Sequence, residues 1–302
     1  MGTPAFAVPS LSALARSETV TLVVTNPDRP SGRGQALSPP PVKLESQRMG
    51  LPLFQPEKAK DPDSVARIAA EKPDLIVVVA YGHILPKSIL DIPAHGCINV
   101  HASLLPKYRG AAPINWAVAR GETATGVTTM KMDVGMDTGP MLLAREIPIG
   151  GDDTAETLFP RISLLGAEAL LEALRRFREG TLREIPQDDS LATYAPMIRK
   201  EHGQIDWTRP AREVRNLIRG MTPWPSAYAS HDGKRLKILS ASVREGGGEP
   251  GEVLDIDREG ILVACGDGAL ALGLVQPEGG KAMASRDYAQ GRRLRKGDRL
   301  YR

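Results

Sequence analysis

An asparagine, a histidine and an aspartate in the middle of the chain could together transfer an acyl group. Asn99 and His101 end a short apolar segment that predicts a buried strand, and strand alternation puts both side chains on one face. Asp137 follows in a Gly-flanked turn after the alternating stretch 127–132. An amide and an imidazole can stabilise an oxyanion, and a histidine–aspartate pair can move protons. Converging on one cleft, the three side chains would suit acyl transfer to an amine.

Each of these residues also has a structural interpretation. A single histidine near a strand end is more often a satisfied structural residue, and a turn aspartate commonly caps its own loop. Cys97 lies between His95 and His101, which could suggest zinc, but no second cysteine or carboxylate stands nearby at metal-ligand spacing. We therefore expect no metal site.

The elements that would position these side chains alternate between strand and helix. Apolar runs predict strands at 20–24, 51–54, 74–79, 97–100, 127–132 and 141–146, with helices between most of them. This alternation is typical of a doubly wound, mostly parallel, Rossmann-like α/β domain, which we assign to residues 1–182. A long helix over 154–178 should be kinked or restarted at Pro160. Arg109 and Gly110 precede another helix, so their backbone amides should be free for an anion or a polar substrate.

The chain changes character after residue 182. Residues 183–202 are polar and irregular, as expected for a linker. Several short strands separated by Gly-rich turns follow, and they predict a small β-barrel, similar to an OB fold, over 203–302. This part carries 17 Lys and Arg against 13 Asp and Glu, whereas the whole chain has a net charge of +3. A basic excess in one domain is typical of a polyanion-binding appendage.

Composition limits the class of protein. The 302 residues suffice for one large and one smaller domain, and the 41% hydrophobic and 25% charged content is typical of a globular protein. No apolar run approaches the ~18 residues of a membrane helix, and the first residues do not form a signal or transit peptide. Cys97 and Cys265 lie far apart, which favours buried thiols in a reducing, cytoplasmic compartment. Residues 2–9 read as a turn and helix start whose preceding strand is missing.

The loop over residues 28–35 contains Arg29 and Arg33 among glycines and prolines. Such a composition predicts a mobile surface loop. Two interpretations remain open at this point: a simple connection between a strand and a helix, or a loop whose arginines follow the phosphates of a nucleic acid.

A long motif surrounds the three candidate residues. It reads Asn99-x-His101-x-Ser103-Leu104-Leu105-Pro106, continues as Arg109-Gly110-Ala111-Ala112-Pro113-Ile114, and ends with Asp137. This pattern resembles the signature of the folate-dependent formyltransferases, and the similarity continues through most of the chain, including the stretch 207–228 with its Pro223-Trp224-Pro225 segment.

The resemblance implies a reaction and a set of substrates. It implies transfer of the formyl group of 10-formyltetrahydrofolate to the α-amine of methionyl-tRNA, for translation initiation, by a monomer that needs no metal. Asn99 and His101 would stabilise the oxyanion, and Asp137 would orient His101, favour its protonated form and help move the amine proton. The segments that would hold the folate are Ala80, Tyr81 and Gly82, together with Ser103, Leu104, Leu105 and Pro106. The family also has a short strand before residue 2.

The resemblance also gives a meaning to the basic regions. It assigns Arg33 to an arginine loop that enters the acceptor arm of the tRNA, with Arg29 beside it, and it makes residues 203–302 a tRNA-binding domain. The alternatives within the family are a glycinamide ribonucleotide formyltransferase, which needs only one domain, a formyltetrahydrofolate hydrolase, and a nucleotide-sugar formyltransferase. Outside it, a nucleic-acid-binding module with a vestigial enzyme domain is a further hypothesis, which the complete set of Asn99, His101 and Asp137 disfavours.

Overall fold

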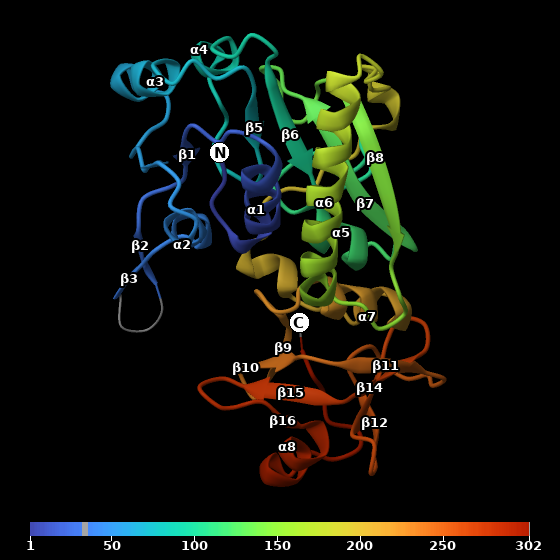
Figure 1. The fold of residues 1–302 in the computed structure, drawn as a ribbon. Coiled ribbons are helices and arrows are strands. Elements are labelled where there is room, and N and C mark those ends of the chain that lie inside the picture. Colours follow the sequence, from blue (N-terminus) through green and yellow to red (C-terminus); the bar gives the residue numbers. More distant parts are fainter. Residues whose placement is uncertain (32–35, 302) are drawn as a thin grey trace. The chain divides into compact units, whose positions relative to one another are not determined.

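The protein is described by a computed structural model covering residues 1–31 and 36–301 (Figure 1). The chain forms two compact units. Unit 1 comprises residues 1–113, 124–148 and 159–196, and unit 2 comprises residues 114–123, 149–158 and 197–302. Unit 2 therefore contains the C-terminal part of the chain and two short segments from its middle, residues 114–123 and 149–158.

Unit 1 contains the α/β part of the chain. Its helices are η1 (Ala5–Ala7), α1 (Val8–Ser17), α2 (Pro41–Arg48), α3 (Pro62–Ala69), α4 (Lys87–Leu90), most of α6 (Ala155–Arg178) and η2 (Asp189–Leu191). Its strands are β1 (Val23–Val24), β2 (Arg29–Ser31), β3 (Ala36–Ser38), β4 (Leu53–Phe54), β5 (Ile76–Val78), β6 (Cys97–His101), β7 (Ala124–Lys131) and β8 (Met141–Pro148).

The main sheet of unit 1 has the strand order β5-β6-β7-β8. The β5–β6 pair is parallel, whereas β7 runs antiparallel to both β6 and β8. The predicted Rossmann-like α/β fold is therefore confirmed with a mixed sheet, because a hydrophobic run does not reveal its own direction. A second parallel pair joins β1 to β4. The first two residues of the chain bridge β1 and the end of β5. The Gly2 N–H donates to Val24 O at 3.0 Å, and the Val79 N–H donates to Met1 O at 2.9 Å.

Helix α6 covers one face of this sheet (Figure 1). Gly166 allows a close approach, because a Cβ there would lie 3.0 Å from Val100 Cγ1 of β6. Pro160 lies inside a continuous helix, so the predicted restart does not occur. The buried apolar side chains of Ile162 and Leu170 continue the helical period on the sheet side. Their burial outweighs the one backbone hydrogen bond that proline cannot donate.

Unit 2 consists of antiparallel sheets and, over its described residues, four helical elements. The helices are α5 (Pro113–Ala119, whose first residue belongs to unit 1), η3 (Lys200–Gly203), α7 (Ala211–Gly220) and α8 (Ser285–Arg292). The strands are β9 (Ala227–His231), β10 (Lys234–Ile238), β11 (Ala241–Arg244), β12 (Val253–Ile256), β13 (Ile261–Ala264), β14 (Ala269–Leu272), β15 (Leu274–Pro277) and β16 (Met283–Ala284).

The strands of unit 2 form two four-stranded antiparallel sheets, with the orders β16-β15-β10-β9 and β11-β14-β13-β12. Side chains from both sheets and from α7 share one core, which includes Leu236, Val263 and Ile218. The predicted small OB-like β-domain is confirmed as a domain of antiparallel strands, arranged here as two four-stranded sheets. Helix α8 was not expected from the sequence.

The segment predicted as a linker, residues 183–202, is divided between the two units at residue 196. Its first part pairs with unit 1, since Ile185 exchanges two backbone hydrogen bonds of 2.8 Å with Met141. Within the described ranges, no helix has the length and apolar character needed to cross a membrane.

Candidate active site

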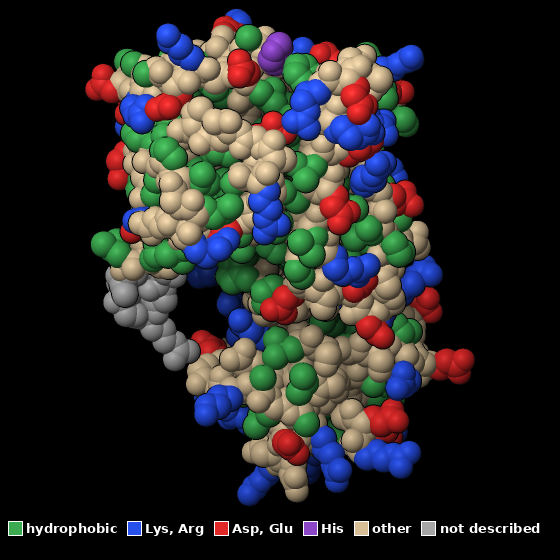
Figure 2. All heavy atoms as spheres, viewed as in Figure 1, with side chains coloured by type: hydrophobic (Ala, Val, Ile, Leu, Met, Phe, Trp, Pro, Cys, Tyr) green, Lys and Arg blue, Asp and Glu red, His purple; other side chains and the backbone are tan. Residues whose placement is uncertain are grey.

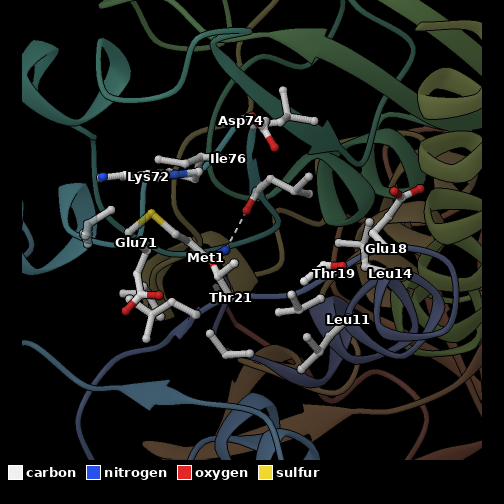
Figure 3. A pocket seen from close by; sticks show the side chains of 18 of the residues that line it. Met1, Leu11, Leu14, Glu18, Thr19, Thr21, Glu71, Lys72, Asp74 and Ile76 are labelled. Atoms are coloured by element: carbon white, nitrogen blue, oxygen red, sulfur yellow. Dashed lines mark hydrogen bonds between the residues drawn. The ribbon is translucent and has the colours of Figure 1, made fainter. Parts of the chain in front are cut away.

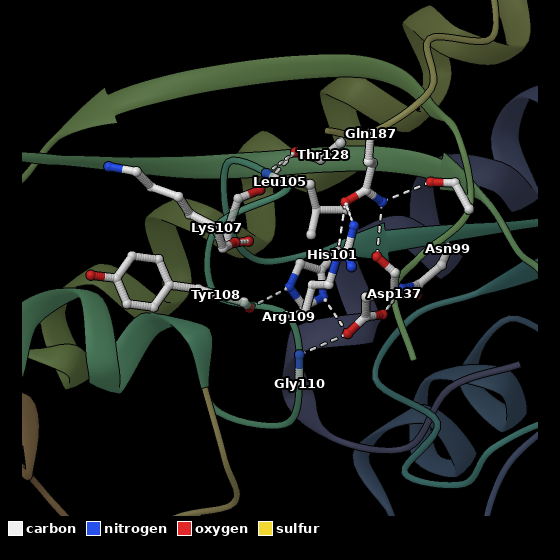
Figure 4. A network of polar contacts seen from close by, with 12 residues as sticks. Asn99, His101, Leu105, Lys107, Tyr108, Arg109, Gly110, Thr128, Asp137 and Gln187 are labelled. Atoms are coloured by element: carbon white, nitrogen blue, oxygen red, sulfur yellow. Dashed lines mark hydrogen bonds and ion pairs between the residues drawn. The ribbon is translucent and has the colours of Figure 1, made fainter. Parts of the chain in front are cut away.

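Strand β6 carries Asn99 and His101 to the same region of unit 1 (Figure 4). Asn99 is paired with Val78 of the parallel strand β5, and His101 is paired with Thr128 of the antiparallel strand β7. The His101 side chain is 6% exposed, so the imidazole is shielded from bulk water. The two residues are one full strand period apart, which directs both side chains to one face.

Asp137 reaches these side chains from the turn between β7 and β8. Its Oδ1 accepts a long hydrogen bond of 3.4 Å from Asn99 Nδ2, and its Oδ2 lies 3.6 Å from His101 Nδ1. Oδ2 also accepts a hydrogen bond of 2.8 Å from the Gly110 N–H. The structure therefore brings the three predicted catalytic side chains together around one carboxylate.

The two ring nitrogens of His101 have different partners. Nε2 lies 2.9 Å from the backbone oxygen of Tyr108. Because a carbonyl oxygen can only accept, we assign the hydrogen of the neutral ring to Nε2. Nδ1 is then the nitrogen that faces Asp137 and is left for a reacting group. When it also carries a proton, the imidazolium donates to Tyr108 on one side and can donate to Asp137 on the other.

The backbone amides near Arg109 are not free, contrary to the expectation from sequence. The Arg109 N–H donates to Thr193 O at 2.8 Å, and the Gly110 N–H donates to Asp137. Gly110 has φ +120°, and a Cβ there would lie 2.7 Å from Ala195 O. Long-range contacts, with Thr193 for the Arg109 amide and with Asp137 for the Gly110 amide, thus use the donors that the local sequence pattern leaves open.

A glutamine that no sequence pattern indicates completes this network. Gln187 Nε2 donates to Asp137 O at 2.8 Å and to Gly139 O at 2.7 Å. Its Oε1 accepts hydrogen bonds of 3.1 and 2.8 Å from Nε and Nη2 of Arg109. Arg109 Nη2 also contacts Asp189 Oδ1 at 2.7 Å. No local pattern could have identified Gln187, because it lies in a polar, aperiodic stretch.

The two predicted folate segments leave the parallel pair β5–β6 at its carboxyl end. In the first, Ala80 and Gly82 have positive φ values of 47° and 88°, and Tyr81 is 2% exposed. Tyr81 O accepts hydrogen bonds from Asn26 Nδ2 at 3.1 Å and from Thr3 Oγ1 at 3.2 Å. These contacts fix the backbone that follows β5.

The second folate segment, residues 103–106, is tied to strand β7. Thr128 Oγ1 donates to Ser103 O at 2.7 Å and accepts from the Leu105 N–H at 3.1 Å. Ser103 Oγ donates to Lys107 O at 2.6 Å. Ser103 and Leu105 are buried. The backbone of this turn is therefore held in place beside His101.

The predicted tRNA-binding arginines are only partly described. Arg33 lies outside the described residues. Arg29 belongs to β2, and its exposed guanidinium lies 3.9 Å from Glu57 Oε2. Such an exposed pair contributes little to stability, so Arg29 can exchange partners.

Basic side chains also occupy the visible surface of unit 2 (Figure 2). A shallow cavity of about 490 Å³ beside α8 is lined by four arginines, by Asp257 and by apolar residues that include Ala289 and Leu294. The arginines are Arg258, Arg286, Arg293 and Arg295. Arg293 and Arg295 belong to the segment 292–296, which contains four basic residues, so this segment contributes positive charge to the cavity.

Another cavity, of about 460 Å³, lies in unit 1 (Figure 3). It is lined by Met1, by residues of the β1 and β5 edges and by side chains of α1. The Met1 amine donates to Val77 O at 2.6 Å, and burial lowers its pKa to about 6. We do not assign the reaction to this cavity, because Asn99, His101 and Asp137 are not among its lining residues.

The cysteines are buried thiols in the structure. Cys97 is 1% exposed and Cys265 is 4% exposed. Burial raises the pKa of Cys97 to about 11 and that of Cys265 to about 12. Over residues 1–31 and 36–301, no group of three or more His, Cys, Asp or Glu side chains is placed to hold a metal ion.

Comparison with known proteins assigns both parts of the chain. Residues 1–174 match the family model described as Formyl transferase, and residues 197–293 match the one described as Formyl transferase, C-terminal domain. The chain is 54% identical to the methionyl-tRNA formyltransferase of Geobacter metallireducens, with 99% of this chain and 97% of the relative covered. It is 55% identical to the methionyl-tRNA formyltransferase of Geobacter sulfurreducens, with 99% and 95% covered.

A solved structure shares the fold at low sequence identity. It is an N-formyltransferase from Helicobacter canadensis in complex with folinic acid and dTDP-3-aminofucose. The TM-score is 0.69 at 20% identity, with 90% of this chain and 97% of the other covered.

Proposed function

Because the chain belongs to the formyl transferase family, we propose that it transfers the formyl group of 10-formyltetrahydrofolate to the α-amine of methionyl-tRNA. The observation that carries the proposal is the meeting of Asn99 and His101 at the Asp137 carboxylate. Two relatives that match over nearly their whole length and are called methionyl-tRNA formyltransferase support this choice of acceptor.

The reaction needs bond changes at the formyl carbon and the transfer of one proton between two nitrogens. The methionyl amine attacks this carbon, and the electron pair of the C=O bond moves to oxygen to give a tetrahedral oxyanion. The C=O bond then re-forms as the bond to folate N10 breaks. The amine loses one proton and N10 gains one, so the products are formyl-methionyl-tRNA and tetrahydrofolate.

We assign the stabilisation of the oxyanion to Asn99 Nδ2 and to protonated His101 Nδ1. One positioned donor of this kind contributes on the order of 3 kcal/mol to transition-state stabilisation. The contact between His101 Nε2 and Tyr108 O fixes the plane of the ring, so that Nδ1 keeps its direction. This contact also leaves Nδ1, and not Nε2, for the reacting oxygen.

Asp137 has two roles in this proposal. Its carboxylate compensates the charge of the imidazolium at Nδ1, and it accepts the amine proton directly or through a water molecule. The Gly110 N–H holds Oδ2, while Oδ1 has only a long contact with Asn99. Oδ1 is therefore the oxygen better placed to exchange partners during the reaction.

We assign the substrates to separate regions of the chain. The folate would lie against Ala80, Tyr81 and Gly82 and against residues 103–106, within the formyltransferase domain 1–182. The tRNA would contact Arg29 and Arg33 and the basic C-terminal domain 203–302, including the arginine-lined cavity beside α8. Residues 183–202 would connect these domains. Because its substrates are those of translation initiation, we place the protein in the cytoplasm, and we propose that it acts as a monomer.

A competition between acceptors tests the choice of substrate. The protein is given 10-formyltetrahydrofolate together with charged initiator tRNA, glycinamide ribonucleotide, an amino-sugar nucleotide and water. We expect formyl-methionyl-tRNA as the main product. Faster formylation of the sugar nucleotide, or faster release of free formate, would instead identify a nucleotide-sugar formyltransferase or a formyltetrahydrofolate hydrolase.

A further inference from the structure

The carboxamide of Gln187 has all of its hydrogen-bonding capacity used by two loops of the candidate active site (Figure 4). A primary amide has two N–H donors and an oxygen with two lone pairs. Both donors bind backbone oxygens of the Asp137 turn, at Asp137 and Gly139. Both lone pairs receive hydrogen bonds from the Arg109 guanidinium. One side chain thus joins the Asp137 turn to the loop that contains Gly110.

These two loops together place the Asp137 carboxylate. The turn sets the position of the Asp137 backbone, and the Gly110 N–H binds Oδ2. Asp137 itself has φ +56°, a left-handed conformation that costs free energy for a residue with a side chain. Its neighbours Val134 and Met136 are exposed, so packing contributes little to the turn at those positions. The contact of its backbone oxygen with Gln187 therefore matters for keeping this conformation.

Gln187 is itself held by a firmly attached segment. Ile185 pairs with Met141 before it, and Ala195 N–H donates to Arg109 O at 2.7 Å after it. The side chain of Arg109 is 3% exposed, so its guanidinium needs partners inside the protein. Gln187 and Asp189 provide them.

We propose that Gln187 is a positioning residue, which sets the distance of the Asp137 carboxylate from His101 and Asn99. The proposal rests on the function proposed above. Glutamine is required at this position by its chemistry, because glutamate could accept from Arg109 but would direct a negative oxygen at two carbonyl oxygens. A small displacement of a catalytic group can reduce the rate about 100-fold.

The test compares Gln187→Ala and Gln187→Glu with wild type, measuring kcat and both KM values well below the melting temperature. We expect kcat to fall about 10- to 100-fold in both variants, with both KM values changed less than about 3-fold. Glu184→Ala is the matched control. It removes the 2.7 Å contact of Lys131 Nζ with the same segment but does not touch the Asp137 turn, so its kcat should stay at the wild-type level.

The Asp137→Asn background shows whether Gln187 acts through Asp137. In that background, adding Gln187→Ala should change kcat less than about 3-fold, because residues that act as a unit are not additive. Fully multiplicative losses would overturn the proposal, and so would wild-type kcat in Gln187→Ala with only a lower melting temperature. If Gln187→Ala fails to fold, Gln187→Glu, which keeps an acceptor for Arg109, decides by the same criteria. A wild-type protein that transfers no formyl group would refute the proposed function instead.

Discussion

Replacing Asp137 by asparagine removes one negative charge while keeping the size of the side chain. The asparagine oxygen can still accept from the Gly110 N–H, which binds Asp137 Oδ2 at 2.8 Å. Its NH2 group then faces Asn99 Nδ2, which is also a donor, at the position where the carboxylate accepts a hydrogen bond of 3.4 Å. The folded structure should survive this change, but the charge opposite His101 Nδ1 is lost.

The size of the effect follows from that lost interaction. A hydrogen bond or ion pair to a charged group contributes about 1.5–3 kcal/mol. The upper value applies when the imidazolium forms in a shielded site, and every 1.36 kcal/mol changes a rate tenfold. We therefore expect kcat for Asp137→Asn to fall at least about 100-fold, with little change in folate binding.

The assay is the rate of formyl-methionyl-tRNA formation for Asp137→Asn, His101→Ala and the double variant, with folate affinity measured separately. The double variant should be hardly slower than either single variant, since the two side chains act as a unit. Turnover within about 3-fold of wild type in Asp137→Asn would refute the reasoning, because the ion pair would then contribute less than any charged contact considered above. Strictly multiplicative losses would show that the residues act independently.

Three further predictions concern other parts of the chain. Arg33→Ala should leave the melting temperature unchanged, raise KM for methionyl-tRNA and make kcat/KM depend less steeply on salt. If the variant and the wild type had equal kcat/KM for methionyl-tRNA at both of two salt concentrations, Arg33 would not belong to the tRNA site. At pH 8, Cys97 and Cys265 should not react with a thiol reagent until guanidinium is added, because burial raises the pKa of each thiol; fast reaction of the native protein would contradict this. Gly126→Ala should destabilise unit 1 by about 1–3 kcal/mol, because its Cβ would lie 2.0 Å from Arg145 O, and a thermal melt equal to that of wild type would contradict this packing.

The meeting of the three proposed catalytic side chains could be predicted from sequence because its signals are local. Asn99 and His101 lie two apart in an apolar strand, and this spacing fixes their common face without any knowledge of the fold. Asp137 was found through the motif, and the structure places its carboxylate between them. The direction of β7 was not predictable, because alternation of apolar residues is the same in parallel and antiparallel strands.

The contacts made by the segment after residue 184 could not be predicted. Gln187 lies in a stretch without periodicity, and its four hydrogen bonds all go to residues about 50 or 80 positions away. The Gly110 amide was expected to be free, because the first amides of a helix have no partner within the helix. In the folded chain the Asp137 carboxylate, 27 positions away in the sequence, accepts its hydrogen bond. The helix α8 was missed because its sequence is mostly polar and tertiary packing of Tyr288 and Ala289 stabilises it.

The most direct test of the proposed reaction follows the formyl carbon itself. Labelled 10-formyltetrahydrofolate is mixed with methionyl-tRNA and an excess of the protein, and the label on the methionyl amine is measured in a single turnover. We predict that nearly all transferred label appears as formyl-methionine after hydrolysis of the tRNA ester, with no transfer from other formyl donors. Label that stays on the folate, or leaves as free formate while methionyl-tRNA is unchanged, would contradict the proposed function.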